Sequence, residues 1–319
     1  MKKFILFIVL LLSVASCSSV GDDAQTGGAD INETKTIEAL KAYNASILDS
    51  CKLTRGGRTL IVASADVVGA IRSISAGKTL AGIFGAASGG AGFAAIVVGT
   101  GLIGGAASSY LAYKGVTTCS YPATIPELFY YTKKIVNGRI VTVKQPNDTE
   151  ARTDEDRCDV SQPAQDVLLP KNFSYLKSIG ADHNAILRTA NVDGELPCAN
   201  IATPEDLEPV LLNEEETELY EKAMSSQELK DYFYEAMGDV RNGKGIETLT
   251  CSERVKQALK EYLDLFQTYP ENVDELVEIA NGYIRIIEEN NEFTKDEKEL
   301  IYAGIMVSVY SPQLWDNFK

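Results

Sequence analysis

The sequence predicts a mainly α-helical protein in which helical segments stand on either side of one small β-hairpin. Apolar residues recur at spacings of three and four over residues 34–75 and again over 204–310, and this is the period of an amphipathic helix. Between them lie a charge-free stretch rich in Gly and Ala, residues 79–113, and one Asn-Gly pair flanked by β-branched runs. Asn-Gly in that setting is a strong signal for a β-hairpin.

The first 16 residues have the form of a signal peptide. Lys2 and Lys3 provide a positive start, and residues 4–14 form an apolar run that is too short to span a bilayer as a helix. The run ends in Val14-Ala15-Ser16-Cys17. These four residues resemble the lipobox of bacterial lipoproteins, and the alternative is an ordinary signal peptide cut at a small-residue site.

The lipobox resemblance implies that cleavage precedes Cys17, whose sulfur and amino group then carry acyl chains such as palmitate. Two or more acyl chains make a stable anchor without a transmembrane helix. Ser18, in place of Asp, follows the cysteine, and in lipoproteins with this kind of signal that implies transfer to the outer membrane. We therefore expect a cell-envelope lipoprotein, on either the periplasmic or the surface side of that membrane.

The composition is acidic, with a formal net charge of −15, which becomes −17 when Lys2 and Lys3 leave with the signal peptide. Binding to nucleic acid needs clustered Lys and Arg that displace counterions, so a nucleic-acid partner is not expected. The same acidity argues against electrostatic recruitment to anionic lipid. Any membrane contact must therefore come from lipidation or from apolar burial.

The N-terminal third is expected to form a tether followed by helices. Residues 17–33 are small, polar and contain glycine, which suits a flexible tether between the lipid and the fold. A first helical pattern begins near Thr34, and a second covers residues 59–75. Gly77 then leads into the charge-free stretch. Residues 34–120 should therefore form one helical unit that ends in an apolar hairpin.

The charge-free stretch, Thr79–Tyr113, carries small residues at spacings of four. It resembles glycine-zipper segments, including those of class II bacteriocins and the hydrophobic hairpins of pore-forming colicins. In lipid, rows of this kind let helices approach closely, and van der Waals packing then drives their association. The residues expected to make such packing or self-association contacts are Gly85, Gly89, Ala91, Ala95, Gly99, Gly101 and Gly105.

The composition of this stretch bears on whether it enters a membrane. Its nine glycines cost a helix about 1 kcal/mol each relative to alanine. Its ten Leu, Ile, Val and Phe residues contribute about −3 to −6 kcal/mol to insertion before that cost, which is weak for two spanning helices. Three arrangements remain open: a hairpin covered by the protein's own helices, insertion that depends on self-association, or a single conventional span.

Residues 121–170 have a different composition. Phe129–Val136 and Arg139–Lys144 are β-branched and aromatic runs around Asn137-Gly138, so two strands joined by a two-residue turn are expected. The alternative is a helix that starts at Pro126 and stops at the Asn-Gly pair. An acidic, polar loop completes this segment.

Residues 171–319 are expected to form an acidic helical domain. Capping boxes, in which Ser or Thr is followed three residues later by Glu, predict helix starts at Ser225 and Thr294. The helix after Thr294 is apolar nearly all round over residues 300–310, so it should lie at the centre of a bundle. Ser311-Pro312 is expected to start a separate final turn, with proline at its first position.

No arrangement of residues predicts catalysis, a metal site or a cofactor. The chain has one histidine, His183, which we interpret as a polar residue near a helix start with Asp182 as the cap. A zinc site needs four ligands at characteristic spacings, and no Cys-x-x-Cys occurs. Gly77-Lys78-Thr79 is like the end of a P-loop, but Arg72 stands where the phosphate cradle needs a glycine. The chain is therefore not expected to be an enzyme.

Export allows disulfide bonds to form. Beyond Cys17 the chain has an odd number of cysteines, so one thiol is expected to be free: Cys51, Cys119, Cys158, Cys198 and Cys251. A Cys51–Cys119 bond would close a loop around the apolar stretch. Cys158 with Cys198, or Cys198 with Cys251, would tie the C-terminal half, and the sequence does not choose between these pairings.

Two functions from different classes fit these features. The first is a lipid-anchored envelope protein that acts without catalysis, through protein–protein contact or self-association. The second is a membrane-active protein, like an antibacterial toxin, whose glycine-zipper hairpin at 79–113 inserts into a bilayer. The two differ in whether the protein's own helices cover that hairpin.

Overall fold

The computed structural model describes ten ranges of the chain: 34–48, 57–86, 90–118, 133–136, 139–142, 166–177, 179–189, 212–241, 245–268 and 273–315. The predicted signal peptide, Cys17 and the tether lie outside these ranges. By its contacts the chain divides into two units, Met1–Glu33 and Thr34–Lys319. The fold described below belongs to the second unit.

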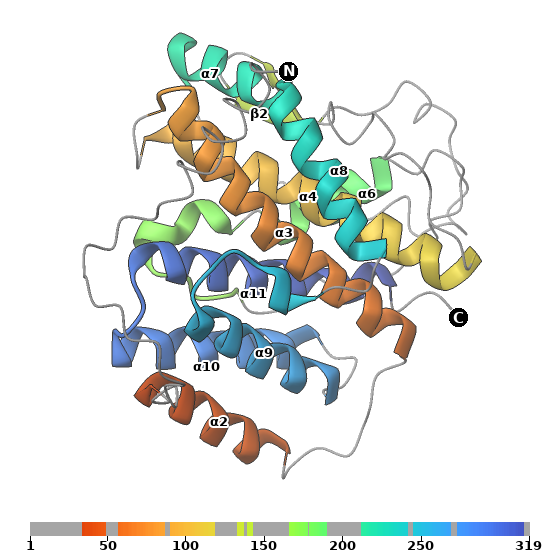
Figure 1. The fold of residues 1–319 in the computed structure, drawn as a ribbon. Coiled ribbons are helices and arrows are strands. Elements are labelled where there is room, and N and C mark those ends of the chain that lie inside the picture. The colour runs from red at the N-terminus through yellow and green to blue at the C-terminus, as the bar shows by residue number, and fades with distance from the viewer. Residues whose placement is uncertain are drawn as a thin grey trace, which may run out of the picture. The chain divides into compact units, whose positions relative to one another are not determined.

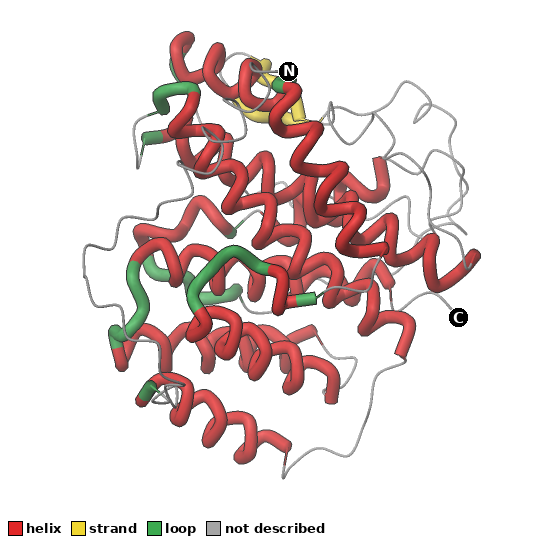
Figure 2. The backbone as a smooth tube through the Cα atoms, viewed as in Figure 1, coloured by secondary structure: helices red, strands yellow, loops and turns green. Residues whose placement is uncertain are grey.

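The described part is mainly α-helical, as the sequence predicts (Figures 1 and 2). The α-helices in chain order are α2 (Lys35–Leu48), α3 (Gly57–Ile83), α4 (Ala91–Thr118), α6 (Ile179–Thr189), α7 (Glu214–Met224), α8 (Gln227–Arg241), α9 (Glu253–Thr268), α10 (Val273–Asn290) and α11 (Lys295–Trp315). Two short 3-10 helices, η3 (Lys171–Leu176) and η4 (Ile246–Thr248), and two strands, β1 (Lys133–Val136) and β2 (Arg139–Thr142), complete it.

α3 and α4 form a hairpin with an extensive contact. The turn after α3 is a Schellman motif. The backbone N–H of Ala86 donates to the carbonyl of Ala81 at 2.8 Å, and that of Gly85 donates to the carbonyl of Gly82 at 3.1 Å. Gly85 has a φ of 80°, a left-handed conformation that glycine adopts without steric cost.

α3 runs without interruption through Gly77 into the charge-free stretch. A Cβ at Gly77 would lie 3.2 Å from the Cα of Val97 on α4, so this glycine allows α4 to approach and does not end the helix. The hairpin therefore begins at Gly57, and its first helix includes Arg72 and Lys78.

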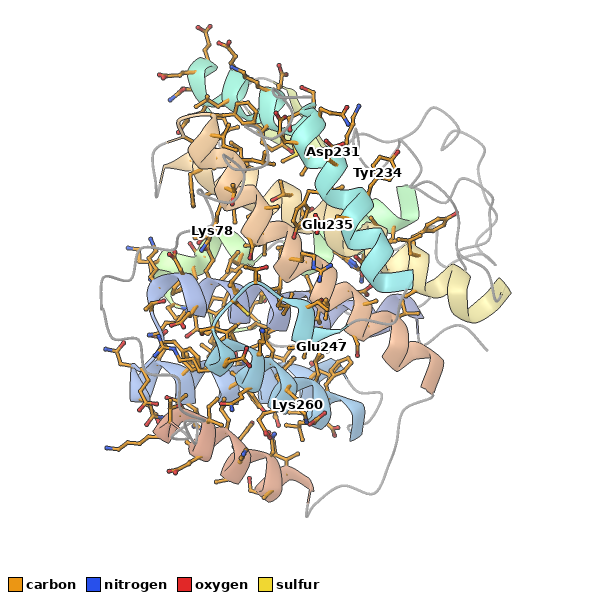
Figure 3. All side chains as sticks on the ribbon, in the orientation of Figure 1. Lys78, Asp231, Tyr234, Glu235, Glu247 and Lys260 are labelled. Carbon is orange, nitrogen blue, oxygen red and sulfur yellow. The ribbon has the colours of Figure 1, made fainter. Side chains whose placement is uncertain are left out.

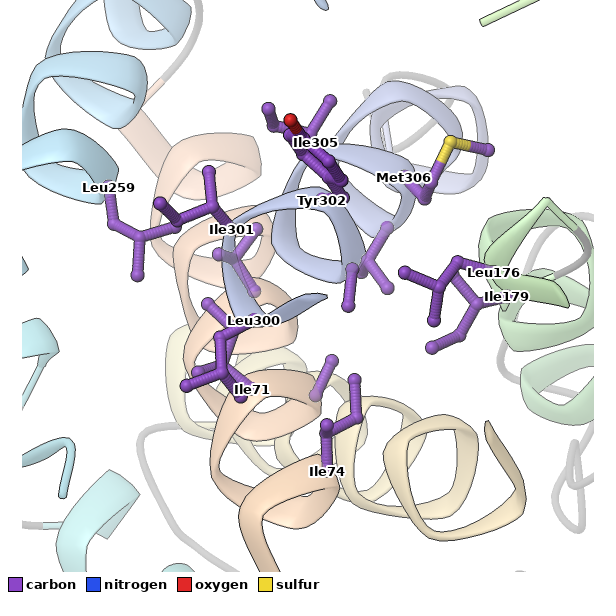
Figure 4. Packing of buried hydrophobic residues seen from close by; sticks show 14 of the residues in the cluster. Ile71, Ile74, Leu176, Ile179, Leu259, Leu300, Ile301, Tyr302, Ile305 and Met306 are labelled. Atoms are coloured by element: carbon purple, nitrogen blue, oxygen red, sulfur yellow. The ribbon is translucent and has the colours of Figure 1, made fainter. Parts of the chain in front are cut away.

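α11 lies at the centre of the hydrophobic core, which confirms the prediction from its apolar composition. Residues 300–309 are all buried, and the helix packs on α3, α6, α9 and α10. A Cβ at Gly304 would lie within 3.3 Å of both Ile71 on α3 and Leu259 on α9. Figure 4 shows these side chains around α11.

α11 continues to Trp315, so the expected separate turn at Ser311-Pro312 is wrong. The Ser311 side chain is buried and its hydroxyl donates to the carboxylate of Asp66 on α3. This contact with a neighbouring helix holds Ser311 within α11, although the following proline locally favours a break.

One predicted capping box is confirmed and the other is shifted. At the start of α11, the N–H of Thr294 donates to Glu297 Oε2 at 2.8 Å and the N–H of Glu297 donates to Thr294 Oγ1 at 3.3 Å. At α8 the cap is Ser226, whose Oγ accepts from the N–H of Leu229 at 3.2 Å. Ser225 is not the cap because its hydroxyl donates to a carbonyl at the end of α7.

The strands β1 and β2 pair in antiparallel fashion around Asn137-Gly138. Lys133 lies opposite Thr142, and Val136 lies opposite Arg139. This register leaves two residues between the strands, the length of the commonest hairpin turns.

Helices from the predicted segments 34–120 and 171–319 share one core. α3 packs on α8 and α11, α4 packs on α6, α7 and α8, and α2 packs on α9 and α10. Buried apolar residues from all these helices belong to one cluster. The segment with the β-hairpin therefore joins two parts of a single helical unit.

Candidate functional site

The two hairpin helices touch along a seam of small residues that repeat every four positions. Gly69, Ser73 and Gly77 of α3 lie against Thr100, Gly104 and Ser108 of α4. A Cβ at Gly69 would lie 2.7 Å from the carbonyl oxygen of Gly104, and one at Gly104 would lie 3.1 Å from that of Gly69. Because the two backbones approach this closely, a side chain at either glycine would force them apart.

The small residues predicted to mediate close packing lie mostly beside this seam. Gly99, Gly101 and Gly105 each meet a side chain: a methionine of α7, an isoleucine of α3 and the histidine of α6, respectively. Ala95 is buried, and Ala91 is half-buried against the core. These residues therefore serve packing within the fold.

Two of the predicted residues have no part in helix contacts that the structure describes. Gly85 forms the turn, and Gly89 lies outside the described residues. The seam residues of α3 lie outside the predicted glycine-zipper stretch, which begins after the charged Lys78. The fourfold spacing of small residues continues across that lysine to Ser73 and Gly69, and that signal could have found them.

The hairpin is covered by other helices of the protein, which is the first of the three arrangements that the sequence left open. α4 contacts α6, α7 and α8 in addition to α3. Among the helices in the described ranges, it is the one long and apolar enough to cross a membrane, over Ala91–Ala112, and 83% of that apolar segment is buried. A helix that is apolar all round belongs either to the core of a large protein or to a membrane.

α3 is tied to the rest of the fold by its charged side chains. Arg72 donates to the carbonyl oxygen of Thr248 at 3.3 Å. Lys78, labelled in Figure 3, lies with its Nζ 3.1 Å from Asp296 Oδ1 and also pairs with Glu299. Both contacts hold charged groups of α3 against polar partners on other elements.

A buried polar cluster joins α3, α6 and α11. The Ser311 hydroxyl donates to Asp66 Oδ2, and His183 Nε2 lies 3.8 Å from the same oxygen. On its other side, His183 Nδ1 lies 3.1 Å from Asn184 Oδ1, and Asn184 Nδ2 donates to the carbonyl of Tyr310 at 2.8 Å. His183 lies near the start of α6, as expected, and its side chain is fully buried.

The three residue types of a Ser-His-Asp triad meet in this cluster in a different order. In the triad, histidine contacts the serine hydroxyl and aspartate holds the histidine. Here the serine hydroxyl faces Asp66, and Asp66, His183 and Ser311 are all fully buried. Asp182 lies inside the first turn of α6, which begins at Ile179, so it is not the cap. We interpret the cluster as a polar link between three helices.

A single carboxylate, that of Glu216, caps two helices at once. Glu216 Oε1 accepts from the N–H of Gly92 in the first turn of α4 at 3.1 Å. Its Oε2 accepts from the N–H of Asn213 at 3.1 Å, and Asn213 Oδ1 accepts from the N–H of Glu216 at 2.9 Å, which completes a capping box on α7. The sequence patterns used above missed this site, because Asn in place of Ser or Thr opens the box.

Of the cysteines, only Cys251 lies within the described ranges. Cys251 carries a free thiol, so the structure does not contain the Cys198–Cys251 bond considered from the sequence. Burial raises the pKa of this thiol to about 11. Cys51, Cys119, Cys158 and Cys198 lie outside the described residues, and no cluster of three or more His, Cys, Asp or Glu side chains suited to a metal occurs within the described ranges.

Comparisons with known proteins give no assignment. No family model, no curated protein and no solved structure matches this chain.

Proposed function

We propose that the chain is an exported lipoprotein of the cell envelope, anchored in the outer membrane by acyl chains on Cys17. Its helical unit then acts at the membrane surface without catalysis, through contact with other proteins or with further copies of itself. The observation that carries the proposal is the burial of α4, because the one helix of membrane-spanning length in the described ranges is used in the core. Attachment to a membrane therefore falls to the N-terminal segment.

The energetics of α3 favour this function over insertion of the hairpin. A bilayer centre costs roughly 2.5 to 3.5 kcal/mol for each charged side chain, so Asp66, Arg72 and Lys78 would cost about 8 to 10 kcal/mol together. The 17 Leu, Ile, Val and Phe residues over 57–113 return about 5 to 10 kcal/mol, from which the glycines of the same helices subtract about 1 kcal/mol each. In the fold, by contrast, Arg72 and Lys78 have polar partners and Asp66 binds the Ser311 hydroxyl.

The buried cluster around Asp66 supports a function without catalysis. Catalytic groups need access to a substrate and a proton path between neighbours. Asp66, His183 and Ser311 are fully buried, and the serine hydroxyl is directed to the aspartate.

Detergent phase partitioning tests the anchor. The full-length chain, expressed in a bacterium that processes lipoproteins, should enter the detergent phase, whereas a Cys17→Ser variant should stay in the aqueous phase. Ser18→Ala is the matched control, because it changes the neighbouring hydroxyl and keeps the acylated sulfur. Inhibition of the lipoprotein signal peptidase should make the unprocessed precursor accumulate. If the Cys17→Ser variant still enters the detergent phase, the anchor lies elsewhere and the proposal is wrong.

A further inference from the structure

The end of the α3–α4 hairpin presents a charge-free surface, which we call the hairpin tip and define as Thr79 and residues 82–86. Ile83 is 59% exposed, and Phe84 beside it is half-buried. No atom lies within 4 Å of a Cβ built at Gly82 or Gly85, so the tip stands clear of neighbouring elements on that side. The Ile83 side chain, at the C-terminal end of α3, lies outside the hydrophobic core.

Contacts through the start of α11 connect the first turn of α2 with the part of α3 that leads to the tip. Thr36, in the first turn of α2, donates from its backbone N–H to Glu292 Oε2 at 2.8 Å. Asp296 follows Glu292 by four residues, and its Oδ1 lies 3.1 Å from Lys78 Nζ. Ile83 follows Lys78 by five residues, about 7.5 Å along a helix. A continuous path of contacts thus connects the tether's point of entry to the exposed isoleucine.

We propose that the hairpin tip is a second, peripheral contact with the bilayer that holds the Cys17 lipid. This inference rests on the proposed lipid anchor. The 17 residues from Cys17 to Thr34 can span at most about 56 to 61 Å. The fold is therefore confined near the bilayer, where a weak contact is strengthened by its high effective concentration.

The chemistry of the tip fits a lipid surface. No charged residue occurs between Lys78 and Lys114, and removing a side chain such as isoleucine from water strengthens an association by about ten- to a hundredfold. Lys222 of α7 lies with its Nζ 5.5 Å from the centre of the Phe84 ring. A lysine above an apolar surface can extend its ammonium group to the headgroups.

The neighbouring carboxylates define the lipid class. Glu218 and Glu221 on α7 are exposed, and α7 packs on α3 and α4. Carboxylates beside the tip repel anionic headgroups, so the contact should form with zwitterionic lipid and should not need anionic lipid.

Tryptophan fluorescence tests the contact. The chain's one tryptophan, Trp315, is first replaced by Phe, and Trp is then placed at Ile83 or, as the control, at exposed Tyr234 on α8. Gly82→Trp is a second probe, because the structure has open space there. Each variant is studied on phosphatidylcholine vesicles with acyl chains that carry bromine, which quenches tryptophan. Circular dichroism confirms that each variant is folded.

The protein is attached to the vesicles in two ways, through its natural lipid and through a histidine tag in place of Cys17 on nickel-chelating lipid. We expect a blue shift and quenching at positions 83 and 82, and neither at position 234. No quenching at 83 and 82 on the chelating vesicles would overturn the proposal. Quenching at all three positions would also overturn it, because the whole unit would then have entered the bilayer.

The two attachments separate this inference from the proposed function. Quenching on chelating vesicles by a chain that fails to stay on vesicles through its own N-terminus would leave the tip contact standing and the lipid anchor wrong. Stable attachment through the natural lipid without quenching would leave the anchor standing and the tip contact wrong.

Discussion

The carboxylate of Glu216 on α7 accepts a hydrogen bond from the backbone N–H of Gly92 on α4, at 3.1 Å. The negative charge also lies at the N-terminal end of both helix dipoles, where it is favourable. Through this one side chain, an acidic surface helix fixes the start of the most apolar helix in the described fold.

Replacing Glu216 should destabilise the whole unit. Glu216→Ala removes a capping acceptor from α4 and the reciprocal bond of the α7 capping box, so we expect a loss of about 1 to 2 kcal/mol in the free energy of unfolding. Urea denaturation followed by circular dichroism measures it. Glu215→Ala is the control, because that side chain is exposed on the same turn. Equal midpoints for the two variants would show that the cap contributes nothing.

The glycine seam should not tolerate a methyl group. Gly104→Ala forces a Cβ against Ser73 and toward the carbonyl of Gly69, and overpacking of this kind costs about 1 to 3 kcal/mol. Gly238→Ala in α8 is the matched control, since no atom lies within 4 Å of its Cβ. That change should stabilise the protein by about 0.4 to 1 kcal/mol. Thermal unfolding of both variants gives the comparison, and effects of the same sign would contradict the seam.

Removing the Ser311 hydroxyl from the buried cluster should destabilise the protein. Ser311→Ala takes from Asp66 a hydrogen bond made in the core, and a buried polar group that loses its partner costs about 1 to 3 kcal/mol. Ser225→Ala removes an exposed hydroxyl that binds a carbonyl of its own helix, and surface changes of this kind stay within about 0.5 kcal/mol. Urea midpoints test the difference. A Ser311→Ala variant as stable as wild type would rule out the polar link.

Acid should weaken the contact between α9 and the start of α11. Although burial alone would raise it, hydrogen bonds from Arg254, Ser252 and Thr294 lower the pKa of Glu297 to about 2, below its ordinary value of 4.5. Because the carboxylate is more acidic in the folded state, its contribution is fully present above about pH 4.5 and is lost as the pH falls toward 2.

The free energy of unfolding of a Glu297→Gln variant should therefore fall less than that of wild type as the pH decreases. With allowance for solvent screening, the wild-type contribution is about 1 to 2 kcal/mol. Urea unfolding at pH 6 and at pH 3 should show a larger loss for wild type than for the variant. Asp264→Asn, which affects an exposed ion pair with Lys260, is the control. Equal losses in wild type and Glu297→Gln would contradict the assignment.

The sequence predicted the helical elements well where a local signal agreed with the tertiary contacts. The Thr294–Glu297 capping box and the all-round apolar face of residues 300–310 were both read correctly. Each signal is contained in a few neighbouring residues, and burial in the core reinforces it.

Local signals failed where a distant contact outweighed them. The helical pattern predicted for residues 59–75 ends before Gly77, whereas α3 continues to Ile83 because α4 packs against a residue without a side chain at that point. Ser311-Pro312 marks a helix start, but Asp66 holds Ser311 within α11. The polar cluster was out of reach for the same reason, because Asp66, His183 and Ser311 are far apart in the sequence and no short spacing connects them.

The docking of α2 has a mechanical consequence. Its Asn44 donates to the carbonyl of Glu261 on α9 at 3.0 Å and accepts from the hydroxyl of Tyr283 on α10 at 2.6 Å. Any force applied to the chain from its N-terminal side reaches the unit first at α2, and only then at α3. A pull from that side would therefore load the contacts of α2 with α9 and α10 first, and the hairpin seam would stay unstrained until α2 had come away.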